Sequence, residues 1–148
     1  MRISLSADSP TIFYVSMHSC WSSKPSVVLH GGPNLSSPPI AAADFHSFSS
    51  TVDIVLGNEK HTLIKSGTFS SSQVFDVHIR STDKNERFEW KASTGAEVAS
   101  LEGQRRGMKL VRVSTGAVVA AWTRPNIGMK KKGKLRFLVR WSIPESYK

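Results

Sequence analysis

Apolar and polar residues alternate in short runs along this chain, and residues typical of turns separate the runs. A two-residue period places alternate side chains on opposite faces of a β-strand. Runs of this kind cover residues 12–18, 27–30, 51–56, 61–65, 74–79, 87–91, 109–113, 117–122 and 135–141. No segment shows a long helical period with capping residues. The pattern therefore predicts an all-β protein of about nine to twelve short strands with turns between them.

The local structure of one segment is ambiguous, and a repeated sequence predicts the structure of two others. Residues 40–48 are apolar but irregular, so either a strand over 41–45 or one helical turn fits them. Residues 93–100 read Ser-Thr-Gly-Ala-Glu-Val-Ala-Ser, and residues 114–121, 21 positions later, read Ser-Thr-Gly-Ala-Val-Val-Ala-Ala. Each copy follows an alternating run, so the repeat predicts two successive β-hairpins, with 98–101 and 117–122 as returning strands.

The alternating runs also predict which aromatic side chains are buried. In the run 87–91, Phe88 and Trp90 should face inward and the three charged residues outward. In the last run, Phe137 and Trp141 share one face and are expected to be buried. In an open sheet this last strand would expose an unpaired edge. Closure of the sheet into a barrel would remove that edge.

Length and composition are those of a single globular domain. A chain of 148 residues predicts one domain over residues 11–141, between a flexible N-terminus over 1–10 and a tail over 142–148. A compact domain of this size buries about 70% of its unfolded surface, which allows a substantial core.

Charge is distributed unevenly along the chain. Residues 1–77 contain four Lys/Arg and five Asp/Glu, whereas residues 78–148 contain sixteen Lys/Arg and six Asp/Glu. The second half therefore carries a net charge of +10, which favours an anionic partner such as a membrane surface, a phosphorylated ligand or nucleic acid. A basic surface that serves only solubility is an equally weighted interpretation.

Cysteine use and hydropathy bear on the compartment. Cys20 is the only cysteine, so the chain cannot form an intramolecular disulfide or a cysteine-based zinc site of its own. The first residues lack the apolar stretch of a secretory signal, and no apolar run approaches the roughly 20 residues of a spanning helix. The expected location is intracellular, either cytoplasmic or peripheral to a membrane, with no transmembrane segment.

The order of several short motifs resembles the tubby C-terminal-like superfamily, which includes plant LURP-one-related proteins and fungal tubby-like domains of unknown function. The resemblance covers residues 11–138 and rests on strand-and-turn motifs in a fixed order. These are Tyr14-Val15, Val55-Leu56-Gly57, Phe88-Glu89-Trp90-Lys91, Val118-Val119-Ala120-Ala121-Trp122 and Lys132-Gly133-Lys134-Leu135. The resemblance implies a closed antiparallel barrel of about twelve strands around an apolar central helix.

The sequence departs from that family after Leu138. The family's central helix lies near the C-terminus, whereas residues 139–148 contain Pro144 and no apolar helix. An unfilled barrel would leave a costly cavity. Truncation of the chain, a collapsed barrel and an element supplied by a partner are the open explanations, and truncation is favoured.

Basic residues form the best candidate site. Residues 124–136 contain six of them, and three more lie between the two predicted hairpins. The two groups would meet if alternate loops emerge at the same end of the barrel. Tubby domains bind phosphoinositides, so the resemblance implies the same ligand class, although no headgroup motif carries over to named residues. The predicted anion-binding residues are Arg105, Arg106, Lys109, Arg124, Lys130, Lys131, Lys132, Lys134 and Arg136.

Signals for catalysis or metal binding are weak. The five histidines lie far apart in the sequence, and neither a nucleophile elbow nor a phosphate-binding loop occurs. We therefore predict no cofactor, no metal and no enzymatic activity. The leading hypothesis is a membrane- or phosphoinositide-binding domain. The alternatives are a nucleic-acid binder, disfavoured because the aromatic residues are expected to be buried, and a protein-interaction scaffold.

Overall fold

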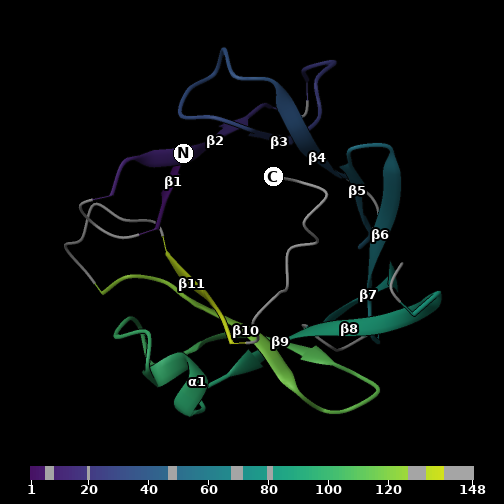
Figure 1. Ribbon diagram of the computed structural model, residues 1–148, viewed down its shortest axis with the longest axis vertical. Coiled ribbons are helices and arrows are strands. Elements are labelled where there is room, and N and C mark those ends of the chain that lie inside the picture. Colours follow the sequence, from purple (N-terminus) through teal and green to yellow (C-terminus); the bar gives the residue numbers. More distant parts are fainter. Residues whose placement is uncertain are drawn as a thin grey trace. The chain divides into compact units, whose positions relative to one another are not determined.

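The computed structural model of the protein describes residues 1–5, 9–19, 21–46, 50–67, 72–79, 82–126 and 133–138 (Figure 1). Within these residues the chain forms eleven β-strands and one short helix. It divides into two compact units, Met1–Ile64 and Lys65–Lys148. All strand pairings inside each unit are antiparallel, which confirms the all-β prediction and the predicted number of strands.

The first unit is an antiparallel meander, in which each strand pairs with the next one along the chain. Its strands are β1 (Arg2–Ser4), β2 (Thr11–Met17), β3 (Val27–His30), β4 (Pro39–Phe45), β5 (Val52–Leu56) and β6 (Glu59–Lys65). The register places Val15, Leu29 and Ala41 side by side on one face, which we call the apolar face of the first unit. Tyr14 and His30 lie side by side on the other, polar face.

A hydrogen-bonded histidine is buried on the polar face of the first unit. Ser16 Oγ lies 3.0 Å from His30 Nε2, and His30 Nδ1 lies 2.8 Å from the carbonyl oxygen of Ser37. Both ring nitrogens therefore have a partner, which a buried polar side chain requires. The interaction ties β2, β3 and the loop before β4 together.

Two expectations about the first unit are resolved. Residues 39–45 form strand β4 rather than a helical turn, and Pro39 takes the first position of the strand, where no ladder hydrogen bond is lost. Arg2–Ser4, within the N-terminus that was expected to be flexible, form β1 against β2. The terminal amine of Met1 donates to the carbonyl oxygen of Val15, so backbone pairing orders a segment whose side chains give no strand signal.

The second unit contains β7 (Gln73–Ile79), β8 (Lys84–Ser93), α1 (Ala96–Ala99), β9 (Gly107–Arg112), β10 (Val118–Thr123) and β11 (Lys134–Phe137). Its strands also pair in chain order. Its core consists of Phe88, Leu110, Val119 and Ala120, with Phe75, Val77 and Trp90 packed against it. Phe88 is 2% exposed and Trp90 is half-buried, which confirms that both face inward.

The helix α1 replaces the strand predicted over residues 98–101. Val98 and Leu101 are buried. The contacts of Glu97 with Lys109 and of Ser100 with Arg136 place α1 on the face of the sheet opposite the core. A Cβ atom added to Gly107 would lie only 2.8 Å from Val98 Cγ1, so glycine at this position lets α1 approach β9 closely. The first of the two predicted hairpins is therefore wrong, and the second, β9 to β10, is confirmed.

The last strand is exposed rather than buried. Leu135 and Phe137 are 54% and 60% exposed, so the expectation that Phe137 is buried is wrong. Alternation placed Leu135 and Phe137 on one face correctly, because they lie opposite Trp122 and Ala120, which are two residues apart on β10. However, alternation does not specify what covers that face. Trp141 and the tail over 142–148 lie outside the described residues.

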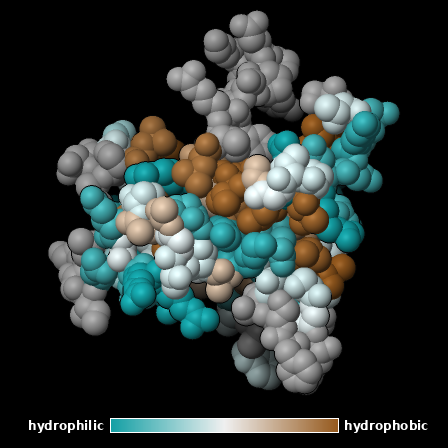
Figure 2. All heavy atoms as spheres, turned by 90° about the horizontal axis from the view of Figure 1, so that it is seen from below, coloured by the Kyte–Doolittle hydropathy of each residue, from teal (hydrophilic) through white to brown (hydrophobic). Residues whose placement is uncertain are grey.

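Strand order within each unit is linear, so neither unit is a closed barrel by itself. The tubby-like barrel, its missing central helix and the single domain over 11–141 stay predictions. In the part of the chain that the structure describes, no helix is long and apolar enough to span a bilayer. Figure 2 shows hydrophobic side chains among hydrophilic ones on the surface, and the exposed large apolar residues include Met17, Trp21 and Phe45.

Candidate anion-binding site

Three chain segments with basic residues meet at one end of the second unit. The register places Gly107 at the start of β9 beside Thr123 at the end of β10, and Thr123 beside Lys134 at the start of β11. The loop before β9, the segment after β10 and the segment before β11 therefore reach the sheet at the same end. The sequence predicted this convergence only on the condition that the loops share one end.

Hydrogen bonds hold two of these segments against each other. The amide of Gln104 donates to the carbonyl oxygen of Arg124 at 2.9 Å, and Thr123 Oγ1 donates to the carbonyl oxygen of Gln104 at 2.8 Å. Thr123 is fully buried, so its hydroxyl is a fixed attachment for the loop. Arg105 and Arg106 are therefore held next to Arg124, and the side chains of all three are exposed.

We call Arg105, Arg106, Arg124 and Lys134 the basic end of the second unit. No ion pair joins any of them to an acidic residue among the described residues. Between Ser100 and Leu138 the sequence contains ten Lys/Arg and a single acidic residue, Glu102. The basic end therefore offers several cations that are free to contact an anion.

Two predicted site residues lie away from this end and have partners within the protein. Lys109 lies inside β9 rather than in the loop before it, and its Nζ is 3.3 Å from Glu97 Oε1. Arg136 Nη1 donates to Ser100 Oγ at 3.3 Å. Both residues lie opposite Ala121, on the face of the sheet that α1 covers. We therefore assign Lys109 to the packing of α1 and leave Arg136 at the margin of the site.

Lys130, Lys131 and Lys132 lie outside the described residues. The chain that carries them leaves the described part at Asn126 and re-enters it at Gly133, directly before Lys134. Their role in the site stays a prediction.

Ion pairs join several charged residues of β7 and β8. Arg87 Nε and Nη2 both donate to the carboxylate of Asp76 at 2.9 Å. This bidentate hydrogen bond lowers the pKa of Asp76 and raises the pKa of Arg87. Lys91 Nζ lies 3.4 Å from Glu89 Oε2 on the same strand. Such paired cations are already neutralised, unlike those of the basic end.

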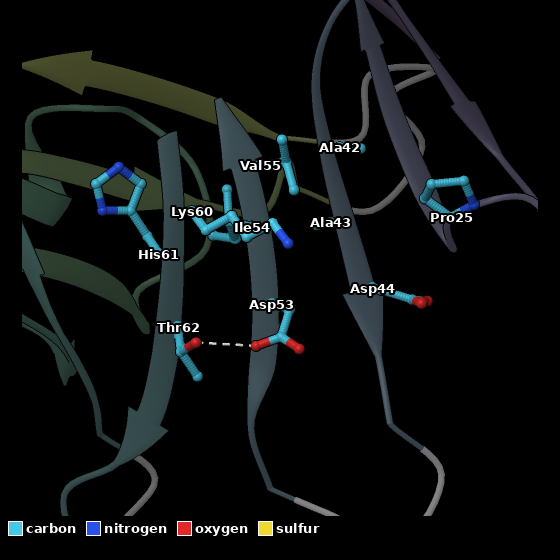
Figure 3. A pocket seen from close by; sticks show the side chains of 10 residues that line it. All are labelled: Pro25, Ala42, Ala43, Asp44, Asp53, Ile54, Val55, Lys60, His61 and Thr62. Carbon is cyan, nitrogen blue, oxygen red and sulfur yellow. Dashed lines mark hydrogen bonds between the residues drawn. The ribbon is translucent and has the colours of Figure 1, made fainter. Parts of the chain in front are cut away.

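A shallow groove of about 480 Å³ on the polar face of the first unit was not predicted from the sequence (Figure 3). Asp44 on β4 and Asp53 on β5 lie directly opposite each other and line it, with Lys60 and Thr62 on β6. Ala42 is among the small residues that leave it hollow. The signal in the sequence was a single aspartate within each of two otherwise apolar strands.

Hydrogen bonds favour the ionised form of both aspartates of the groove. His46 Nε2 lies 2.8 Å from Asp53 Oδ2 and Thr62 donates to Asp53 Oδ1 at 2.9 Å, which lowers the pKa of Asp53. Ser26 Oγ donates to Asp44 at 2.7 Å and lowers the pKa of that carboxyl. Carboxylates of low pKa do not act as general acids near neutral pH.

The described residues contain no cluster of three His, Cys, Asp or Glu side chains of the kind that holds a metal ion. Cys20 lies outside the described residues. The basic end of the second unit is thus the site with the clearest chemistry, which is the binding of anions. Comparison with known protein families, curated proteins and solved structures found no match to this chain.

Proposed function

We propose that this chain is a non-enzymatic, tubby-like β-barrel domain that binds acidic membrane surfaces or phosphoinositides through the basic end of the second unit. One observation carries the proposal: Arg105, Arg106, Arg124 and Lys134 converge from three segments and have no acidic partner among the described residues. The proposed place of action is intracellular, in the cytoplasm or at a membrane periphery, which fits a chain with a single cysteine.

The energetics suit weak, reversible attachment. A Lys or Arg near an anionic membrane contributes about 1 kcal/mol, and salt screens the contribution over about 8–10 Å. Four such residues therefore give binding that is detectable at low salt and decreases as salt is added. Arginine at three of the four positions also favours contact with phosphate, because its planar guanidinium can donate two parallel hydrogen bonds.

Vesicle sedimentation tests the proposal. Phosphatidylcholine vesicles with and without a phosphoinositide are mixed with the protein at low and at high salt. We expect binding only with the phosphoinositide, a decrease at high salt, and loss of most binding in the double variant Arg105→Glu with Arg106→Glu. A second variant, with Lys130, Lys131 and Lys132 each changed to Glu, tests the predicted residues that the structure does not describe.

The matched control reverses two exposed lysines elsewhere, Lys65→Glu with Lys84→Glu, and so makes the same change in net charge. Binding that falls equally in this control would reflect net charge rather than a site. Equal binding to both kinds of vesicle at low salt would overturn the proposal.

A second candidate function, binding of single-stranded nucleic acid, is favoured by the exposure of Phe137. Nucleic-acid binding was disfavoured because the aromatic residues, including Phe137, were expected to be buried. This exposed aromatic ring offers a base-stacking surface on the strand that begins with Lys134 of the basic end. Mobility shifts with short oligonucleotides that weaken in Phe137→Ala would favour this function over the lipid proposal, and an absence of any shift would remove it.

A further inference from the structure

Strand β11 is the last strand of the second unit, and one of its edges is open. Among the described residues it pairs with β10 alone, from Lys134 beside Thr123 to Phe137 beside Ala120. An open strand edge presents backbone N–H and C=O groups that can pair with a further strand. The outer edge of β11 is therefore a surface on which an extended chain can bind.

The hydrogen bonds to β10 show which backbone groups of β11 point outward. The amide of Leu138, directly after the strand, donates to the carbonyl oxygen of Val119 at 2.9 Å. Alternate residues of an antiparallel strand exchange hydrogen bonds with the same neighbour, so the backbone groups of the even-numbered residues of β11 also face β10. Those of the two odd-numbered residues, Leu135 and Phe137, therefore point away from β10 and are available to an added strand.

Contacts with the rest of the second unit position β11. Arg136 Nη1 donates to the hydroxyl of Ser100, which caps the end of α1, at 3.3 Å. Gly133, directly before the strand, lies against Trp122, because a Cβ atom at this glycine would be only 2.6 Å from the indole Nε1. A partner strand would thus meet an edge that is already in place, which reduces the entropic cost of binding.

Side chains of opposite character lie on the two faces of this edge. Leu135 and Phe137 share one face, and both side chains are more than half exposed. Lys134 and Arg136 lie on the other face. No ion pair between either cation and an acidic residue occurs in the part of the chain that the structure describes. The edge therefore combines exposed apolar groups on one face with uncompensated positive charge on the other.

An added antiparallel strand would contact both sets of side chains. Its residues opposite Leu135 and Phe137 would exchange hydrogen bonds with β11 and place their own side chains beside these apolar groups. Its residues opposite Lys134 and Arg136 would place their side chains beside the cations. Complementarity therefore requires apolar and acidic residues in alternation along the partner strand.

A second copy of the chain fits this edge poorly. Two β11 strands paired antiparallel with Leu135 opposite Leu135 would place Lys134 opposite Arg136. With Leu135 opposite Phe137, the two copies of Arg136 would lie opposite each other. Like charges directly opposite destabilise a sheet, and cations on a short edge strand limit self-association. The same cations attract a strand that carries carboxylates.

We propose that the open edge of β11 binds an extended acidic segment of a protein partner as an added antiparallel strand, in which apolar and acidic residues alternate. In this mode of recognition, backbone hydrogen bonds supply affinity and the alternate side chains supply specificity. The proposal goes beyond the binding of lipid, because the ligand is a polypeptide and its principal contacts are the backbone groups of Leu135 and Phe137.

Peptide binding tests the proposal with the unchanged protein. The probe is a capped, fluorescein-labelled peptide of sequence Val-Glu-Val-Glu-Val-Glu-Val, and its binding is followed by fluorescence polarisation. Its valine nitrogens would face β11 and its glutamate nitrogens would face away. We expect methylation of the valine nitrogens to weaken binding at least about tenfold, because carbonyl oxygens of β11 would lose their donors. Methylation of the glutamate nitrogens is the matched control and should leave binding intact. Equal affinities of the two methylated peptides, or no binding of the unmodified peptide at millimolar concentration, would overturn the proposal.

Substitutions in β11 test the backbone and the charge separately. Leu135→Pro removes an outward amide but no hydrogen bond to β10, so we expect about tenfold weaker peptide binding and a native circular dichroism spectrum. Arg136→Glu should weaken binding about fivefold, because it changes a cross-strand attraction into a repulsion. It should also bind a peptide with lysine in place of glutamate more tightly than the unchanged protein does. Lys84→Glu, at the exposed start of β8, is the matched control. An equal loss in Arg136→Glu and Lys84→Glu would overturn the proposal, because net charge would then explain the binding.

Two further measurements separate this proposal from its alternatives. Sedimentation velocity should show a monomer at every protein concentration. A concentration-dependent dimer that is lost in Leu135→Pro would overturn the proposal, because a second copy would then occupy the edge. Vesicle binding of Leu135→Pro should equal that of the unchanged protein, so failure of peptide binding and failure of lipid binding are distinguishable.

Discussion

Two stretches of the second unit begin with the same four residues, Ser-Thr-Gly-Ala, yet they fold differently. Residues 93–100 leave β8 and wind into α1, whereas residues 114–121 make the turn between β9 and β10 and continue as β10. The two glycines show the difference directly. Gly95 has a φ of −72° and precedes the helix, whereas Gly116 has a φ of +72° in the hairpin turn.

The residues after the shared four explain the divergence. The first copy continues with Glu97, whose carboxylate accepts a hydrogen bond from Ser93 Oγ at 2.5 Å and pairs with Lys109. An acidic residue in the first turn also interacts favourably with the helix N-terminus. The second copy has Val118 at the equivalent position, and a β-branched residue favours a strand. The copies differ at one further position, where Ser100 of the first copy donates to the carbonyl oxygen of Glu97 at 3.0 Å and the second copy has Ala121.

The comparison also reveals a shared requirement. Val98 in the first copy and Val119 in the second occupy equivalent positions, and both are almost completely buried. Val98 packs beside Gly107 on one face of the sheet, and Val119 belongs to the core on the other. Each copy therefore anchors its own side of the second unit with the same side chain, in spite of the difference in local structure.

Substitution of these two valines should have the largest effect on stability. We expect Val98→Ala and Val119→Ala each to lower the free energy of unfolding by about 2 kcal/mol, because two buried carbons contribute about 0.8 kcal/mol each and a cavity adds to the loss. Urea unfolding followed by circular dichroism measures both. A much smaller cost for Val98→Ala would show that α1 packs loosely and that only the second copy supports the unit.

The two glycines should respond unequally to alanine. Gly116→Ala forces a side chain into a left-handed conformation, which costs about 1–2 kcal/mol. Gly95→Ala keeps an ordinary backbone, but its new Cβ would lie 2.5 Å from Glu97 Oε2 and would displace the carboxylate. We expect Gly95→Ala to cost about 0.5–1 kcal/mol, because alanine is a poorer helix N-cap residue than glycine. Equal costs, again from urea unfolding, would contradict the difference in backbone conformation.

The smallest effect is expected from the charge of Glu97. The hydrogen bond from Ser93, and secondarily the contact with Lys109, lowers the pKa of Glu97 in the folded protein. Its carboxylate therefore stabilises the fold above the unfolded-state pKa of about 4.3, and this stabilisation is lost as pH falls through the folded-state pKa. Glu97→Gln should remove that part of the acid-induced loss of stability.

Unfolding midpoints measured across the acid range check this expectation. Glu102→Gln serves as the control for removal of one negative charge, because Glu102 lies on the exposed loop that follows α1. If Glu97→Gln retains the full acid dependence of the unchanged protein, the carboxylate does not stabilise the first copy.

The sequence predicted those parts of the fold that depend on short-range alternation. The strand over 27–30 and the inward position of Phe88 follow directly from a two-residue period. It failed at α1, where the alanines and Glu97 are good helix formers but the likeness to residues 114–121 suggested a strand. It also missed β1, since pairing of its backbone with β2 requires no apolar side chain.

The site residues could likewise be predicted from local sequence features, but not where they depend on contacts between distant segments. Clustering of basic residues in the sequence indicated Arg105, Arg106 and Arg124, and the strand register brings them to one end. The pairing of Lys109 with Glu97 could not be predicted, because it depends on α1 lying over β9. The exposure of Phe137 and Trp21 depends on what covers each face and each loop, and the alternation of residues along a single strand carries no information about that.

The pairing of each strand with the next one along the chain also bears on how each unit is made. Every ladder inside a unit joins neighbours in the sequence, so the loops that must close are short and their entropic cost is low. Strands of the first unit can therefore pair one after another as they emerge during synthesis, before the second unit exists. Low contact order of this kind favours rapid folding and shortens the time during which unpaired edges are open to other chains.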